Sequence, residues 1–116
     1  MTKSNFLGEL DELVLLTIAV LHDEGAYGYS VVQEIQEKTG RKVSLSAVHT
    51  VLYRLQDRGL VQSELGGASQ NRGGRRKRLF YVSQLGKQSI AKIKLQRDKY
   101  WQEIGDLSLG LELVVY

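Results

Sequence analysis

The sequence contains no cysteine, and this absence excludes disulfides, thiolate metal sites and cysteine nucleophiles. It also has no long apolar run. The longest, residues 13–21 interrupted only by Thr17, is far shorter than the roughly 20 residues that cross a bilayer. The residues before it, Glu9, Asp11 and Glu12, form an acidic lead-in that does not fit a signal peptide. We therefore expect a cytoplasmic protein that does not enter a membrane.

The patterns typical of catalysis, metal binding and nucleotide binding are also missing. His22 and His49 are far apart and have no cysteine or carboxylate at ligand spacing. No serine, histidine and acid arrangement and no isolated carboxylate pair suggests a catalytic site. The glycine-rich segment GGASQNRGG at residues 66–74 lacks the Gly-Lys-Ser/Thr ending of a phosphate loop. We predict a protein that is not an enzyme and has no metal or cofactor.

The length and composition predict one ordinary domain with an extension. The chain has 116 residues, of which 42% are hydrophobic and 25% charged, values typical of a globular protein. Its net charge of +3 is unevenly distributed, because residues 41–97 carry 13 basic and 2 acidic side chains while residues 1–40 carry 2 and 7. A concentrated positive charge attracts polyanions, nucleic acid above all. The alternative is a solvated basic loop on an unrelated fold.

A short amphipathic helix is expected at residues 45–58. Ser44 can cap its start, and Gly59 can close its end in a left-handed conformation. Its buried stripe is predicted to be Leu45, Val48, Leu52 and Leu55. The opposite face and its flanks carry Ser46, Thr50, Tyr53, His49 and Arg54. A helix with such a polar face can enter the major groove of DNA.

Two short strands, residues 60–65 and 79–82, are expected directly after this helix, around a loop rich in glycine. Five of the seven residues from Arg72 to Arg78 are basic. A helix followed at once by a basic hairpin is the order of a winged helix. We expect the hairpin to reach a phosphate or the minor groove.

The remaining elements predict a dimer. The helix expected at residues 9–22 is apolar on nearly every side and needs cover from a second chain. Another helix is expected at about residues 30–38, and a short strand is expected around Lys42 and Val43. A final helix at residues 84–107, capped by Ser83, would exceed 30 Å, at about 1.5 Å per residue. Its apolar residues recur at heptad spacing, which is typical of a helix that packs against another helix.

The residues resemble those of the PadR-like transcriptional regulators over most of the chain. Four segments carry the resemblance: LGELDELVLLTIAVL, GYSVVQEIQEKTG, VSLSAVHTVLYRLQDRGLV and GGRRKRLFYVSQLG. The resemblance implies a winged helix-turn-helix fold, a homodimer built by the first and last helices, and repression at a palindromic operator. The length and the single C-terminal helix are similar to those of the short subfamily, which includes regulators that respond to drugs or small aromatic compounds.

Two departures from the family pattern bear on DNA recognition. The family usually has Thr-Leu-Tyr-Pro in the exposed helix, where this chain has Ala47, Val48, His49 and Thr50, so the base preference is expected to differ. The basic start of the second strand is one residue longer than usual.

A tryptophan used by drug-binding members lies about one turn earlier than Trp101, where this chain has Arg97.

The predicted fold is therefore mainly α with a small β-hairpin, in the α+β class. Residues 1–82 would form the DNA-binding domain, whose first helix also contacts the partner, and residues 83–116 the dimerisation helix and tail. The predicted DNA-binding residues are Ser44, Ser46, His49, Thr50, Tyr53, Arg54, Arg72, Arg75, Arg76, Lys77 and Arg78. The predicted dimer residues are Leu13, Leu16, Ile90, Ile93, Arg97, Tyr100, Trp101 and Ile104. Tyr100 and Trp101 are also candidates for binding a small aromatic effector.

Two other functions are compatible with this pattern. A winged-helix module could use the hairpin to bind an acidic protein partner. A small-molecule-sensing dimer could hold an aromatic ligand between its C-terminal helices, with DNA binding as a secondary property.

Overall fold

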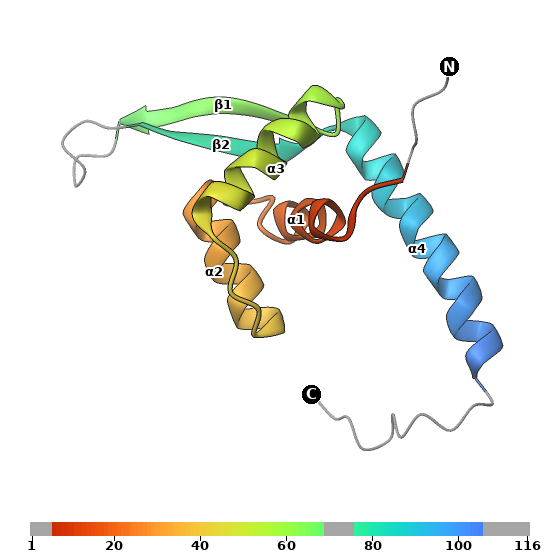
Figure 1. Cartoon of the computed structure of the whole chain (residues 1–116). Coiled ribbons are helices and arrows are strands. Elements are labelled where there is room, and N and C mark those ends of the chain that lie inside the picture. Colours follow the sequence, from red (N-terminus) through yellow and green to blue (C-terminus); the bar gives the residue numbers. More distant parts are fainter. Residues whose placement is uncertain (1–5, 69–75, 106–116) are drawn as a thin grey trace.

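The computed structural model describes residues 6–68 and 76–105, and side chains throughout those ranges except at residues 67, 68 and 76. The elements follow one another as three helices, two strands and a last helix (Figure 1). Their bounds are α1 (Glu9–Val20), α2 (Gly28–Thr39), α3 (Leu45–Asp57), β1 (Val61–Ala68), β2 (Arg76–Val82) and α4 (Gln84–Ile104). This confirms the predicted α+β class with a small hairpin.

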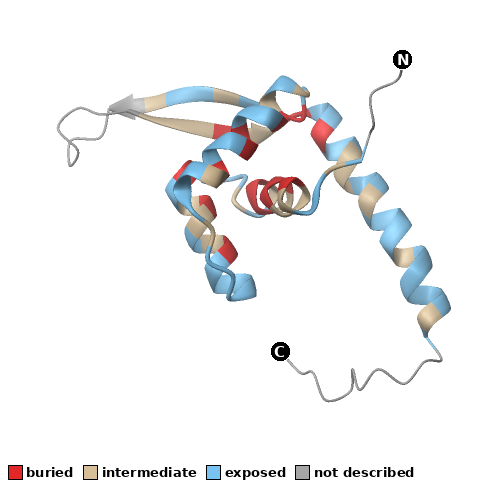
Figure 2. Ribbon diagram, viewed as in Figure 1, coloured by how far each residue is buried: buried red, intermediate tan, exposed pale blue. Residues whose placement is uncertain are grey.

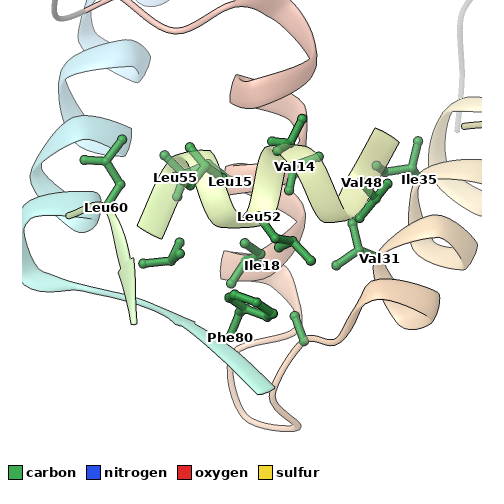
Figure 3. Close-up of a cluster of buried hydrophobic side chains, with 13 residues drawn as sticks. Val14, Leu15, Ile18, Val31, Ile35, Val48, Leu52, Leu55, Leu60 and Phe80 are labelled. Atoms are coloured by element: carbon green, nitrogen blue, oxygen red, sulfur yellow. The ribbon is translucent and has the colours of Figure 1, made fainter. Parts of the chain in front are cut away.

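The core lies between the first three helices and the base of the hairpin. Figure 3 shows side chains from α1, α2 and α3 meeting Phe80 of β2. In Figure 2 the buried positions gather around α1, while most of α4 beyond its first turns is exposed or half-buried. The largest fully buried side chains are Val14, Leu15, Ile18, Val31, Ile35, Val48, Val51, Leu52 and Leu55. Burying that apolar surface is the main force holding α3 on the domain.

Helix α3 begins and ends as its sequence predicts. The side chain of Ser44 accepts the backbone N–H of Ala47 at 3.1 Å, which satisfies one unpaired donor of the first turn. At the other end Gly59 has a φ of +79°, and the N–H of Leu60 reaches the carbonyl oxygen of Leu55 at 2.9 Å. This left-handed closure turns the chain directly into β1.

The predicted buried stripe of α3 was wrong at its first position. Leu45 is 46% exposed, because the first turn of the helix extends past the core, where Leu45 lies against Gly28 at the start of α2. Val51, which was not in the predicted stripe, is buried instead. The buried face therefore begins at Val48.

The hairpin is antiparallel and longer than predicted. Its register pairs Val61 with Val82 and Ser63 with Phe80, and it shifts between Leu65 and Ala68. The strand expected around residues 42 and 43 does not form. The other edge of β2 is instead occupied by Ala26, whose N–H and carbonyl group both pair with Phe80, at 3.2 and 2.7 Å.

The start of α4 is joined closely to the end of α3. Ser83 caps α4 by accepting the N–H of Gly86 at 3.0 Å, and its hydroxyl donates to the carbonyl oxygen of Gly59 at 2.6 Å. A Cβ atom at Gly86 would overlap the carbonyl oxygen of Leu60 and lie 2.7 Å from Cγ1 of Val82. The helix ends at Ile104, three residues before the predicted Leu107, and Gly105 follows it outside the helix.

Within the described residues, the structure has no helix of the length and apolar character that a membrane span requires.

Candidate nucleic-acid interface

The outer face of α3 presents hydroxyl groups. Ser46 and Thr50 are exposed one turn apart, and the Thr50 hydroxyl donates to the backbone carbonyl of Ser46 at 3.0 Å. Ser44 Oγ lies 3.3 Å from Ser46 Oγ. Because the Thr50 proton is engaged with the backbone, the oxygen lone pairs and the methyl group remain for partners. Such groups can accept from base amino groups and contact the methyl group of thymine.

Tyr53 and His49 connect the outer face of α3 to β2 and α2. The ring of Tyr53 meets Phe80 of β2 edge-on, with centroids 5.7 Å apart and an interplanar angle of 81°. His49 is exposed but lies against Gly28 at the start of α2. The structure thus brings α3, α2 and β2 together around the predicted DNA-binding face.

Arg54, also predicted to bind DNA, is held by α1. Its Nε and Nη2 donate to Oδ2 and Oδ1 of Asp11 at 2.7 and 2.6 Å. The Asp11 side chain is only 8% exposed and that of Arg54 is 50% exposed. The hydrogen bonds that Arg54 donates to Asp11, and then the negative charge of Asp11, raise the pKa of Arg54 above its already high ordinary value. DNA binding by Arg54 stays a prediction, and positioning α3 on α1 is a role that the sequence did not suggest.

The acidic first turn of α1 holds three arginines from different parts of the chain. Besides the Asp11 and Arg54 pair, Arg41 donates to both carboxylate oxygens of Glu9 at 2.8 and 2.7 Å. Arg97 of α4 donates to Glu12 at 2.9 Å. All three arginines belong to the basic middle of the sequence. The charge count by segment therefore overstates the positive charge of the folded surface, because these carboxylates offset part of it.

Two basic residues of the wing, which is the hairpin of β1 and β2, also have partners inside the domain. Lys77 Nζ lies 4.2 Å from the ring centroid of Tyr27, a distance at which a cation is attracted to an aromatic face. Arg78 Nη1 donates to Ser63 Oγ at 3.0 Å, and the Ser63 hydroxyl donates to the side chain of Gln56. These contacts fix the wing relative to α2 and α3.

The other basic positions of the wing are less fully described. Arg76 opens β2, and its side chain lies outside the described part of the structure. Arg72 and Arg75 lie outside the described residues. Their predicted DNA contacts therefore stay predictions.

The predicted dimer residues are spread along two helices. Leu13, Leu16, Ile90, Ile93 and Ile104 are half-buried. Tyr100 and Trp101 are 69% and 53% exposed. An open groove of about 880 Å³ runs between α4 and the segment that leads into α1. Its lining includes Phe6, Leu7, Glu12, Ile93, Arg97 and Tyr100.

Among the described residues, no three histidine, aspartate or glutamate side chains gather as metal ligands would.

Comparisons with known proteins identify the family. A model of the transcriptional regulator PadR-like family matches residues 17–92. The structure is similar to that of a PadR-like transcription factor from Bacteroides fragilis, with 18% identity, a TM-score of 0.68, and coverage of 85% of this chain and 89% of that one. It is also similar to a PadR family transcriptional regulator from Eggerthella lenta, with 24% identity, a TM-score of 0.66 and 85% coverage of each chain. A PadR family regulator from Clostridium difficile gives 24% identity and a TM-score of 0.63 over 84% of this chain and 94% of that one.

The comparison with curated proteins gave no match. The family match covers well over half of the sequence, and the fold agrees with it from α1 to α4. The chain therefore belongs to the PadR-like family of transcriptional regulators.

Proposed function

We propose that this protein is a homodimeric repressor that binds a palindromic operator in double-stranded DNA. The observation that carries the proposal is the exposed hydroxyl face of α3 beside a hairpin whose second strand begins with basic residues. In winged helices, α3 enters the major groove and the wing contacts the backbone or the minor groove. Family membership supports this assignment, because PadR-like proteins are transcriptional regulators.

The exposed apolar surface of α4 supports the proposal that the protein dimerises through α4 and α1. This helix is 21 residues long, and Tyr100 and Trp101 near its end lie largely in solvent in the single chain. The groove beside Tyr100 offers a place for a partner helix. Two-fold symmetry of the protein requires two-fold symmetry of the operator, with half-sites about 34 Å apart. On this proposal, residues 1–82 form the DNA-binding domain and residues 83–116 the dimerisation segment.

Base recognition is assigned to α3 and general attraction to the wing. Replacing Thr50 by alanine is expected to change base preference at one position of each half-site, by about 1 kcal/mol. Replacing Arg76 by alanine is expected to weaken all sequences alike and lower the salt slope by about 0.9 per lost phosphate contact. Binding titrations against a panel of single-base operator variants measure both effects.

Lys38→Ala is the matched control for charge, because Lys38 is exposed in the last turn of α2, at the opposite end from the wing. It should leave affinity and base preference unchanged. A base-specific effect of Arg76→Ala together with a uniform effect of Thr50→Ala would reverse the two roles.

We also propose that the dimer binds a small aromatic effector. Trp101 is the single tryptophan and is half-exposed, so a flat aromatic compound bound between paired C-terminal helices should quench its fluorescence. A titration with a broad panel of such compounds measures this. The absence of quenching by all of them would remove the effector from the proposal.

Selection of bound fragments from the source genome by the purified protein tests DNA binding, symmetry and target together. Recovery of a palindromic sequence upstream of a gene is the expected result. The competing protein-interaction function predicts no enriched fragment, and a protein partner whose capture survives nuclease treatment.

A further inference from the structure

Helix α4 is attached to the rest of the domain at two separate points. The first is its N-terminal turn, where Ser83 donates to Gly59 and Gly86 packs on the backbone of Leu60. These contacts join the start of α4 to the end of α3. Ile90, one turn after Gly86, packs against the core and belongs to the same attachment. Because all these contacts lie within the first turns of α4, they act together as a pivot and leave its direction to be set farther along.

The second attachment is the ion pair between Arg97 and Glu12, whose side chains are 57% and 20% exposed. Arg97 lies eleven residues after Gly86 in α4, about 16 Å along the helix at 1.5 Å per residue. Glu12 follows Asp11 directly, and Asp11 holds Arg54 of α3. The first turn of α1 therefore forms ion pairs with both α4 and α3.

We propose that Asp11, Glu12, Arg54 and Arg97 form a strut that fixes the angle between α4 and α3, and thereby the operator spacing that the dimer accepts. The proposal rests on the proposed function, because spacing matters only for a dimer joined through α4. The pivot holds the start of α4, and the strut fixes the direction of the helix. Asp11 and Glu12 are positioning residues and need not touch DNA.

The half-site spacing is sensitive to the strut, because a small displacement at Arg97 changes the angle of α4. A displacement of about 2 Å at Arg97, acting about 16 Å from the pivot, rotates α4 by roughly 7°. When α4 is held in the dimer, the same rotation moves Thr50 of α3, ten residues and about 15 Å from the pivot at Leu60, by about 2 Å. The two subunits together therefore change the distance between the two α3 helices by about 4 Å. The rise of duplex DNA is about 3.4 Å per base pair. Losing the strut is therefore sufficient to change the half-site spacing that the dimer accepts by about one base pair.

The expected effect is bounded by the exposure of the pair. An ion pair between partly exposed side chains changes an equilibrium by at most about fivefold. We therefore expect Arg97→Gln to reduce discrimination against an operator lengthened by one base pair by about threefold to fivefold. Binding to an isolated half-site should not change.

The test measures the angle directly and then its consequence. Because the chain has no cysteine, spin labels can be placed on Thr50→Cys in α3 and Gln102→Cys in α4, with unlabelled protein added so that only distances within one chain are read. We expect a narrow distance distribution in the parent, and a broader or shifted one after Arg97→Gln or Glu12→Gln. Arg97→Lys, which keeps a charged donor for Glu12, should restore the narrow distribution.

Unlabelled versions of the same variants are then titrated with operators of different half-site spacing. An unchanged distance distribution in both glutamine variants would overturn the strut. A broader distribution with unchanged spacing preference would overturn its role in specificity. If the parent binds no DNA, the proposed function fails, and the distance distribution still decides whether the strut exists.

Discussion

Raising the salt concentration from about 50 mM to about 200 mM is expected to weaken binding of this protein to duplex DNA by about a thousandfold. Arg72, Arg75 and Arg76 in each subunit are the residues that we assign to phosphate contacts. Each neutralised phosphate releases counterions and contributes about −0.9 to the slope of log affinity against log salt. Six such contacts in a dimer give the expected loss. Fluorescence anisotropy with a labelled operator at several salt concentrations measures the slope.

A variant with these three arginines replaced by serine should lose most of that slope, because three of the other arginines between residues 41 and 97 are engaged with carboxylates. Arg41, Arg54 and Arg97 each pair with a carboxylate of α1. A flat salt response of the parent protein would contradict the DNA-binding proposal. A slope that persists in the triple variant would place the phosphate contacts elsewhere.

Replacing Gly86 by alanine is expected to lower the free energy of unfolding by about 3 kcal/mol. The added Cβ would overlap the carbonyl oxygen of Leu60, and backbone cannot move aside as a flexible side chain can. The start of α4 would have to move off the end of α3, which also breaks the hydrogen bond from Ser83 to Gly59. Urea unfolding followed by circular dichroism, at one fixed protein concentration, measures the change.

Gly105→Ala is the matched control for the same substitution at the other end of α4. There a Cβ would meet only the carbonyl oxygen of Gln102, at 3.3 Å, which a small adjustment of the helix end relieves. Alanine favours helix over glycine by up to about 1 kcal/mol, so the control should be neutral or stabilising. Equal effects of the two substitutions would show that helix propensity, and not the close approach to Leu60, governs position 86.

Helix α3 and the hairpin could be predicted because their signals are local. The structure uses Ser44, Val48, Leu52, Leu55 and Gly59 as predicted, and all of them lie within sixteen residues of one another. The two predicted strands and the glycine-rich loop between them are equally close in sequence. Leu45 was misplaced because periodicity gives the face of a helix and does not show how far the core extends along it.

The contacts that position the interface could not be predicted, because they join residues far apart in sequence. Arg54 and Asp11 are separated by 43 residues, and Arg97 and Glu12 by 85. The acidic first turn of α1 has a sufficient local explanation in the helix dipole, so nothing in the sequence indicated arginine partners. Likewise Ala26 carries no strand signal, although it pairs with Phe80 at the edge of β2.

The pairing of Ala26 with Phe80 has a consequence for how the chain acquires its shape. The hairpin can form early, since β1 and β2 are neighbours in sequence, but docking it beside Ala26 closes a long loop that contains α2 and α3. Loop closure costs chain entropy before the apolar contacts of Phe80 compensate for it. We expect the two halves of the DNA-reading surface to gain their mutual orientation in one late step, so that a newly made chain becomes competent only when folding is nearly complete.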